Sequence, residues 1–572
     1  MNNRKYIEYL NSLHNYNAQN ENAYGEKNVE NPYFKEIMVR VGLCDYIKDS
    51  LTLKKPHILI LTGHAGDGKT SIMYQVLTDL GVQFDSKEKV TEICFEENKK
   101  CLCVKDFSEL PEEDKENQIS RLSIMRKSVD MVKNGNYVFM VANTGPIINT
   151  FGELFDTKEE EEEAKIKLIN MMDSNAGEID CINDIPMCVI NVANVDNVYF
   201  ATEFLDKIIQ EKLWTECKNC NKQGYCHIYR NRNLISENKS RVFEFVKSHF
   251  VWLLEYGTRL TIRSMTEQLA YMITGGVYCE EIDQNEPYKY LFSNLFFGYI
   301  GTKLNERALG IMAIEAANRC LYDHKRLRSD EKLLIRKDYK KLFGENVEEI
   351  VKDAEKNNAF IKGWTEFLRR TYFFMNIVTD NEIVEQDYED IFSKQFRRYI
   401  QLRDGIDTPS IIDANLIADA LSMIYVGTPS DGKEIPLTLS RESGISQNVQ
   451  LVTGTIPARK LRLEAKETAD STFMKGKKRY ELKLKIGKKV LDTVLNLPML
   501  DYFEELKNGV IATNIDPQLS HGVESLKNQI SEKMEEEDDE NIIDIIVLKN
   551  SGNSNICLEL TYYGKIREIQ EV

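Results

Sequence analysis

One segment constrains this chain more than any other, a glycine-rich loop between an apolar run and a helical pattern. Residues Gly63-His-Ala-Gly-Asp-Gly68-Lys69-Thr70 match the pattern G-x-x-x-x-G-K-S/T at every fixed position. The apolar run 57–62 precedes the loop, and the helical pattern 71–80 follows it. Glycines let the backbone curl so that N–H groups point at phosphate oxygens, and a helix N-terminus adds positive partial charge. The context therefore predicts a phosphate-binding loop; the alternative is a chance match in an ordinary strand–helix turn.

The residue types of this loop predict a site for a nucleoside triphosphate with Mg²⁺. Lys69 should reach the β- and γ-phosphates, and the Thr70 hydroxyl should hold Mg²⁺. ATP is favoured over GTP because no convincing N-K-x-D guanine signature is present; Asn194-Val-Asp196 lacks the lysine. The expected nucleotide-binding residues are Gly63, Gly66, Asp67, Gly68, Lys69, Thr70 and Ser71.

Strand-like and helix-like stretches alternate from about residue 55 to residue 201. Short apolar runs lie at 57–62, 101–105, 137–142 and 187–192, with helical patterns near 71–80, 119–133 and 162–172. Nearly continuous apolar strands separated by helices indicate a parallel sheet covered on both faces. We therefore predict an α/β fold of the P-loop NTPase type, AAA+-like or STAND-like. A helical lid and a C-terminal α+β domain complete the predicted architecture.

The pattern changes along a chain of 572 residues, which is too long for one hydrophobic core. Residues 1–54 form a helical lead-in, and 55–238 form the predicted ATPase core, with a cysteine-rich insertion at 214–231. Residues 239–426 are mostly helical in pattern and form the lid and a helical domain. Turn residues and extended stretches predict the α+β domain at 427–572.

Carboxylates at the end of the second apolar run are candidates for the metal-side chemistry. Asp106 follows the run 101–105 and is the candidate Mg²⁺ acid, and Glu109 is the candidate for polarising the attacking water. Lys105 and the two-residue gap depart from the usual pattern of four apolar residues followed by Asp-Glu. The alternative is that Asp106 is a helix N-cap.

Three further residues are candidates for sensing the nucleotide. Asn143 ends the run 137–142, where AAA+ and related ATPases place a γ-phosphate sensor; alternatively, Asn-Thr-Gly is a turn. Arg263 directly precedes the helical pattern 264–273 and is a candidate second sensor, whereas Arg259 is a candidate to serve a neighbouring subunit. Surface ion pairs are the alternative for both arginines.

A cysteine cluster lies beyond the predicted core, in Cys217-Lys-Asn-Cys220-Asn-Lys-Gln-Gly-Tyr-Cys226-His227. A Cys-x-x-Cys turn followed by Cys-His is typical of a metal knuckle in an intracellular protein. We expect structural Zn²⁺ held by Cys217, Cys220, Cys226 and His227. Adjacent ligands are geometrically awkward, so the fourth ligand could come from elsewhere. Free thiols and a redox Cys-x-x-Cys are the alternatives.

Charge and hydropathy limit where the protein works. No apolar run approaches the roughly 20 residues that span a bilayer, and the first residues lack the apolar core of a signal peptide. We therefore expect a cytoplasmic protein with no membrane partner. The net charge of −17 argues against coating nucleic acid by bulk electrostatics, although it permits a local groove or binding through a partner.

Several segments occur in an order that resembles a known family. They are the phosphate loop, Val104-Lys-Asp-Phe-Ser-Glu109, Ala142-Asn-Thr-Gly145, the cysteine segment with Asn231-Arg-Asn233, Leu260-Thr-Ile-Arg263 with Thr274-Gly-Gly276, and Asp492-Thr-Val-Leu-Asn-Leu-Pro. This order is similar to the ATPase subunit of phosphorothioation-dependent DNA restriction systems, the DptF type (also called DndF type). The resemblance implies an ATP-hydrolysing subunit of a bacterial anti-phage complex that acts on DNA lacking the phosphorothioate modification.

The same resemblance implies partner subunits of helicase or nuclease type, with DNA reached through the complex, and a homo-oligomer is an open alternative. Two other functions fit the residues: a STAND-type signalling or scaffold ATPase, and an AAA+ ATPase of DNA replication or helicase loading. Nuclease activity is not expected in this chain. Glu464-Ala-Lys466 has an E-x-K spacing, but no matching upstream acid can be assigned.

Overall fold

The computed structural model divides the chain into two compact units, Met1–Ile391 with Ala469–Lys477, and Phe392–Thr468 with Lys478–Val572. The residues it describes are 3–14, 31–82, 88–95, 99–112, 119–174, 176–282, 286–375, 381–438, 449–468, 473, 478–510, 515–534, 542–547, 556–562 and 566–571. Each unit is described by itself below.

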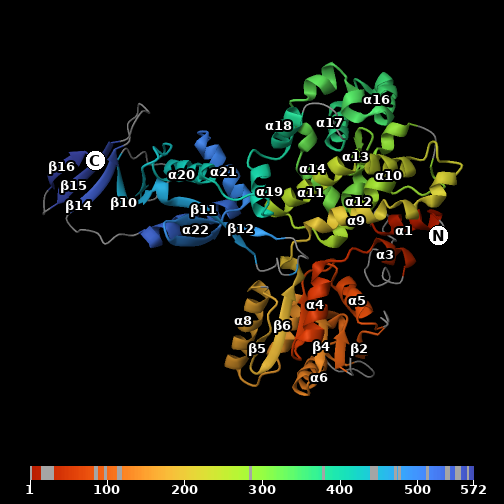
Figure 1. The fold of residues 1–572 in the computed structure, drawn as a ribbon, viewed down its shortest axis with the longest axis horizontal. Helices are drawn as coiled ribbons and strands as arrows, with labels where there is room; N and C mark the ends of the chain where they lie inside the picture. The colour runs from red at the N-terminus through yellow and green to blue at the C-terminus, as the bar shows by residue number, and fades with distance from the viewer. Residues whose placement is uncertain are drawn as a thin grey trace. The chain divides into compact units, whose positions relative to one another are not determined.

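The first unit contains a six-stranded, mostly parallel sheet in the order β2-β3-β4-β1-β6-β5 (Figure 1). The strands are β1 (Ile58–Thr62), β2 (Val90–Phe95), β3 (Lys99–Val104), β4 (Tyr137–Val141), β5 (Asp180–Ile182) and β6 (Ile185–Asn191). The pairs β3–β4, β4–β1 and β1–β6 are parallel, whereas β2 and β5 pair antiparallel at the two edges. The predicted mixed α/β class with a mostly parallel sheet is therefore confirmed.

Alternate residues of the central strands pack on opposite faces of the sheet. Ile58 and Ile60 join a cluster with residues of α6 (Arg121–Lys133), α7 (Thr144–Gly152) and α8 (Lys158–Ser174). Leu59 and Leu61 join a second cluster with α4 (Gly42–Leu53) and α5 (Lys69–Asp79). β1 is fully buried because helices cover both of its faces. A strand in this position is a continuous apolar run in the sequence. Two helical layers thus hold β1 in the middle of the sheet.

The rest of the first unit is mostly helical. Its longer helices are α1 (Asn3–Ser12), α9 (Val198–Ile208), α10 (His227–Glu237), α11 (Lys239–Glu255), α12 (Ile262–Thr274), α14 (Met312–Arg319), α16 (Glu345–Asn358), α17 (Trp364–Phe373) and α18 (Asn381–Ile391). The shorter ones are α3 (Pro32–Ile37), α13 (Phe292–Leu295) and α15 (Tyr339–Phe343). Among the described helices, none combines the length and apolar character that a membrane crossing requires.

The second unit combines antiparallel strands with helices. One sheet has the order β16-β15-β14-β10-β9 and another has the order β11-β12-β13. Their strands are β9 (Glu434–Thr438), β10 (Val449–Pro457), β11 (Leu461–Glu467), β12 (Tyr480–Ile486), β13 (Lys489–Val494), β14 (Ile542–Val547), β15 (Ile556–Tyr562) and β16 (Ile566–Glu571). The helices are α19 (Phe396–Arg403), α20 (Ile411–Tyr425), α21 (Leu497–Lys507) and α22 (Pro517–Met534). The unit begins at Phe392, so α19 and α20 group with these strands rather than with the preceding helices.

Candidate nucleotide-binding site

The glycine-rich loop joins the carboxyl end of β1 to the start of α5, and three of its glycines adopt backbone angles that side chains disfavour. The φ angles of Gly63, Gly66 and Gly68 are +140°, +91° and +80°. Space is also short, because a Cβ on Gly66 would lie 3.1 Å from Thr261 Oγ1. The loop therefore requires glycine for two reasons, and its backbone curls where the sequence pattern predicted that it would.

Lys69 points its ammonium group into this curl. Its Nζ atom donates hydrogen bonds to the carbonyl oxygens of Gly63 and His64, both at 2.8 Å. A third bond, at 3.3 Å, goes to Asn143 Oδ1 at the tip of the neighbouring strand β4. The Lys69 side chain is buried although it carries a charge. The structure therefore brings two predicted site residues, Lys69 and Asn143, into direct contact.

Charged groups surround the Lys69 ammonium. Burial lowers the pKa of Lys69, while the carboxylates of Asp67 and Asp106 act in the opposite direction and Arg263 lowers it further. All four residues were predicted for the site, from three different parts of the sequence. Because electrostatic effects of this kind fall with distance, they place Asp106 and Arg263 in the neighbourhood of the loop.

The first turn of α5 adds main-chain donors to this edge of the sheet. Thr70 and Ser71 lie in that turn and are partly exposed, and Gly68 is the N-cap residue. The first N–H groups of a helix have no acceptor within the helix, so they are available to an anion. Beside them, Thr62 Oγ1 and Thr144 Oγ1 lie 3.0 Å apart, which joins the end of β1 to the start of α7. Thr144 was not predicted.

Asp67 is a structural member of the loop. Its side chain is fully buried, and Oδ2 accepts a hydrogen bond from the His64 N–H at 2.9 Å. Oδ1 accepts from Arg259 Nη1 at 3.0 Å, and Arg259 Nη2 donates to Val192 O at 3.3 Å. Arg259 was a candidate to serve a neighbouring subunit. In this structure it holds the loop of its own chain to the end of β6.

The start of α12 lies directly on the loop. The main-chain N–H of Arg263 donates to Gly66 O at 3.1 Å, and Thr261 caps the helix by accepting from the Ser264 N–H. One turn further, Glu267 is buried, and burial raises its pKa to about 7 while Arg263 acts against the rise. Glu267 was not predicted, since a single glutamate in a helical pattern carries no signal of its own.

Asp106 lies two residues after the end of β3 and has two sets of neighbours. Its Oδ1 accepts from the N–H groups of Ser108 at 3.0 Å and Glu109 at 3.3 Å, so it caps the short helix Phe107–Glu109. Burial raises the pKa of Asp106, Glu109 raises it further, and Lys69 lowers it. A carboxylate has about four acceptor positions, so the cap leaves room for another ligand. Both interpretations of Asp106 are therefore compatible with its geometry.

Glu109 and Asn143 differ in their surroundings. The Glu109 side chain is half-exposed and pairs with Lys89 at 2.7 Å, turned toward solvent rather than held in the loop. Asn143 precedes α7, and its N–H donates to Ser108 Oγ at 2.7 Å. Ser108 thus links the ends of β3 and β4. It was missed as a site residue, although it lies within the Asp-Phe-Ser-Glu segment that drew attention to Asp106.

The cysteine cluster lies at some remove in the sequence, between α9 and α10. Cys217 belongs to the short helix Thr215–Asn219, Cys220 is exposed, and the Cys226 sulfur caps α10 by accepting from the Tyr229 N–H at 3.5 Å. His227 is oriented for packing: its Nε2 lies 3.2 Å from Thr274 O, and its ring stacks on Tyr290. The part of the chain that the structure describes contains no group of three or more His, Cys, Asp or Glu side chains already in metal-binding geometry.

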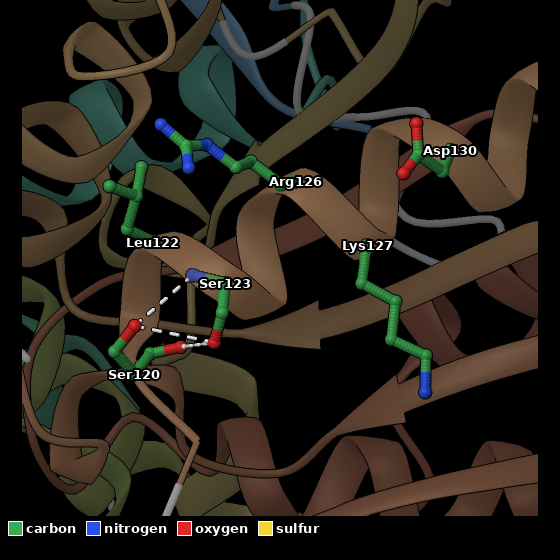
Figure 2. A pocket seen from close by; sticks show the side chains of 6 residues that line it. All are labelled: Ser120, Leu122, Ser123, Arg126, Lys127 and Asp130. Atoms are coloured by element: carbon green, nitrogen blue, oxygen red, sulfur yellow. Dashed lines mark hydrogen bonds between the residues drawn. The ribbon is translucent and has the colours of Figure 1, made fainter. Parts of the chain in front are cut away.

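A surface hollow lies on one face of α6 (Figure 2). It is lined by Ser120, Leu122, Ser123, Arg126, Lys127 and Asp130. Ser120 is the N-cap of this helix, and Lys127 pairs with Glu92 of β2 at 2.5 Å. The hollow contains no residue of the loop or of the strand ends, so it does not belong to the candidate site.

Comparison of the chain with protein-family models, with curated proteins and with solved structures finds no match.

Proposed function

We propose that this chain is a P-loop NTPase that binds and hydrolyses ATP with Mg²⁺. One observation carries the proposal: the Lys69 ammonium lies inside a glycine loop at the carboxyl end of β1 and donates to Asn143, while Asp67 and Asp106 are close enough to raise its pKa. In the sheet, β1 lies where the chain order reverses, with β4 on one side and β6 on the other. Open α/β sheets bind ligands at such switch points, beyond the carboxyl ends of the strands.

The contacts of Lys69 suggest how the loop receives a triphosphate. Two carbonyl oxygens and one amide oxygen now accept the three hydrogen bonds of its ammonium. Phosphate oxygens carry full negative charge, so they compete well for these donors. We expect Nζ to turn from Gly63 and His64 toward the β- and γ-phosphates, where it stabilises the charge of the transferring group.

The neighbouring strand ends supply the remaining groups. Thr70 and Asp106 would hold Mg²⁺, which neutralises phosphate charge when bound. Asn143 would contact the γ-phosphate from the tip of β4. Glu109 is the candidate for orienting the water, for which it must leave Lys89. Arg263 would reach the phosphates from the start of α12.

The biological role that we propose follows the family resemblance in the sequence. The chain would be the ATPase subunit of a cytoplasmic restriction complex that acts on DNA lacking phosphorothioate modification. Helicase- or nuclease-type subunits would be its partners, and much of the DNA contact would be theirs. The net charge of −17 supports this division of labour.

ATP hydrolysis by the full-length chain tests the proposal. Lys69→Ala should lower the rate about 100-fold or more, because one preorganised cation is removed from the phosphoryl group. Lys133→Ala, a change of an exposed lysine at the end of α6, is the matched control and should not alter it. Equal rates for wild type and Lys69→Ala would refute the enzymatic assignment. Stimulation by unmodified duplex DNA would favour the restriction role over a STAND-type switch.

A further inference from the structure

A lysine ties the cysteine turn to a distant segment that contains another cysteine. Lys222 lies between Cys220 and Cys226, and its Nζ donates to the carbonyl oxygens of Cys279 at 2.9 Å, Glu280 at 3.1 Å and Ile282 at 3.3 Å. Three carbonyls of one short segment thus surround the ammonium of the turn. The contact brings Cys279 beside the turn that contains the other cysteines, although it follows Cys226 by more than fifty residues.

The contact between α10 and α12 also keeps the cysteine turn beside the segment that contains Cys279 (Figure 1). α10 begins directly after Cys226, and α12 ends five residues before Cys279. His227 Nε2 lies 3.2 Å from Thr274 O, and Asn231 Nδ2 donates to Ile273 O at 3.1 Å, so the start of α10 is fixed to the end of α12. Two cysteines from distant parts of the chain are therefore anchored near each other by buried hydrogen bonds.

Electrostatics agree with this placement. Burial, together with the nearby thiols of Cys226, Cys217 and Cys220, raises the pKa of Cys279 to about 12. All three cysteines of the turn are therefore close enough to influence Cys279. Cys279 itself is half-buried.

A partly buried arginine, Arg230, also lies here. The N–H of Arg230 donates to Cys226 O, which places Arg230 one helical turn beyond that cysteine. Its Nη2 donates to Pro287 O at 2.7 Å, but its buried Nε has no hydrogen-bond partner among the residues that the structure describes. A buried donor left unpaired costs free energy, and the thiolate of Cys226 would accept a hydrogen bond from this Nε. Arg230 and Lys222 together would balance the two negative charges of a Zn²⁺ ion held by four thiolates.

We propose that Cys217, Cys220, Cys226 and Cys279 form a tetrahedral Zn²⁺ site, with Cys279 in the place that the sequence suggested for His227. Each of the four thiols releases its proton and forms a Zn–S bond of about 2.3 Å, so the binding of one Zn²⁺ releases four protons. Rotation about χ1 brings each sulfur toward the ion. His227 keeps its packing contact with Thr274.

The site has a structural role that goes beyond the proposed hydrolysis of ATP. It cross-links the turn before α10 to the segment after α12. The opposite end of α12 lies on the phosphate loop through the Arg263 contact with Gly66. Zinc would therefore fix one end of the helix whose other end covers the nucleotide site.

Metal content of the full-length chain, expressed with added zinc, tests the proposal. We expect one Zn²⁺ per chain, and Co²⁺ in its place should show the strong visible absorption of tetrahedral thiolate coordination. Cys279→Ser should lose zinc, whereas His227→Gln and the control Cys320→Ser, a half-buried thiol outside the cluster, should keep it. Zinc retained in Cys279→Ser, or lost in His227→Gln with the fold intact by circular dichroism, would overturn the assignment.

Thiol alkylation of the wild-type chain provides a test that needs no variant. Cys220 is exposed and should react with iodoacetamide only after zinc is removed. Cys94 and Cys181 are also exposed and should react in both states, which makes them internal controls. Equal reactivity of Cys220 with and without zinc would contradict the proposal.

Discussion

The phosphate loop and the cysteine turn both connect regular elements, but they are held in different ways. The loop 63–68 lies between a fully buried strand and a helix of the same core, and its shape comes from glycine backbone angles. The turn 217–226 is mostly exposed, and the side chain of Lys222 attaches it to the segment 279–282. The first site is thus built into the fold, whereas the second depends on contacts between segments far apart in sequence.

This difference has consequences for ligands. A loop fixed by its backbone is preorganised, so binding a triphosphate costs little additional ordering. A turn fixed by a few side chains gains much of its order from the metal it binds, because binding free energy is then also folding free energy. We therefore expect nucleotide binding and metal binding to respond differently to mutation and to chelation.

The largest effect is expected at Asp106, where the metal-side role and the capping role can be separated. Asp106→Asn keeps a good N-cap residue but removes the negative charge. We expect hydrolysis of ATP to fall about 100-fold with an unchanged melting temperature, since only the charge that holds Mg²⁺ is lost. Asp130→Asn, on the exposed face of α6, is the control. Full activity of Asp106→Asn would exclude the Mg²⁺-binding role and leave Asp106 with only its role as the N-cap of the short helix.

Chelation should separate the two regions next. A zinc chelator applied to the wild-type chain should raise tryptic cleavage at Lys218 and Lys222 about tenfold, because the turn loses its cross-links. The affinity for Mg·ATP, measured in the presence of excess Mg²⁺, should stay the same within a factor of about two. A loss of nucleotide binding on chelation would show that the phosphate loop depends on the zinc site.

A smaller effect is expected from alanine substitutions at Gly66 and Gly81, which share a left-handed backbone but differ in the residues around them. Gly66 and Gly81 have φ angles of +91° and +73°, but only Gly66 has Thr261 and Arg263 within 3.2 Å of an added Cβ. Each change to alanine should cost about 1–2 kcal/mol of stability from the left-handed backbone. Gly66→Ala should also weaken Mg·ATP binding about tenfold, or about 1.4 kcal/mol. Equal binding by both variants would argue against contact between α12 and the loop.

The smallest effect is expected from pH, through Glu267 at the start of α12. Its pKa in the folded chain is about 7, raised by burial from 4.5. The folded state therefore binds the proton more tightly than the unfolded state, and stability is lost as pH rises from about 4.5 through 7. The melting temperature of wild type should fall by a few degrees across that window. Glu267→Gln, which resembles the neutral form, should not show that fall.

The sequence predicts the two regions to different extents. Periodicity and the glycine pattern locate β1, β3, β4 and β6, because buried parallel strands give continuous apolar runs. The edge strands β2 and β5 were missed, since short strands exposed at an edge carry polar residues such as Glu92. Signals within a short stretch of sequence thus predict the buried strands and the glycine loop, but not the edge strands.

Long-range partners have no comparable signal. The Asp67–Arg259 pair joins residues 192 positions apart, and neither residue type indicates the other. Cys279 is a single cysteine outside any motif, so its position beside the turn emerges only from Lys222 and the packing of α10 against α12. In the same way, the burial of Glu267 depends on the elements that surround α12.

A calorimetric titration of Mg·ATP into the full-length chain tests the central claim most directly, with inorganic triphosphate as competitor. If the loop closes on the phosphate tail, wild type should bind Mg·ATP and Mg·triphosphate should compete, while Lys69→Ala should bind neither and Lys133→Ala should match wild type. Absence of binding by wild type, or binding that Lys69→Ala retains in full, would contradict the account.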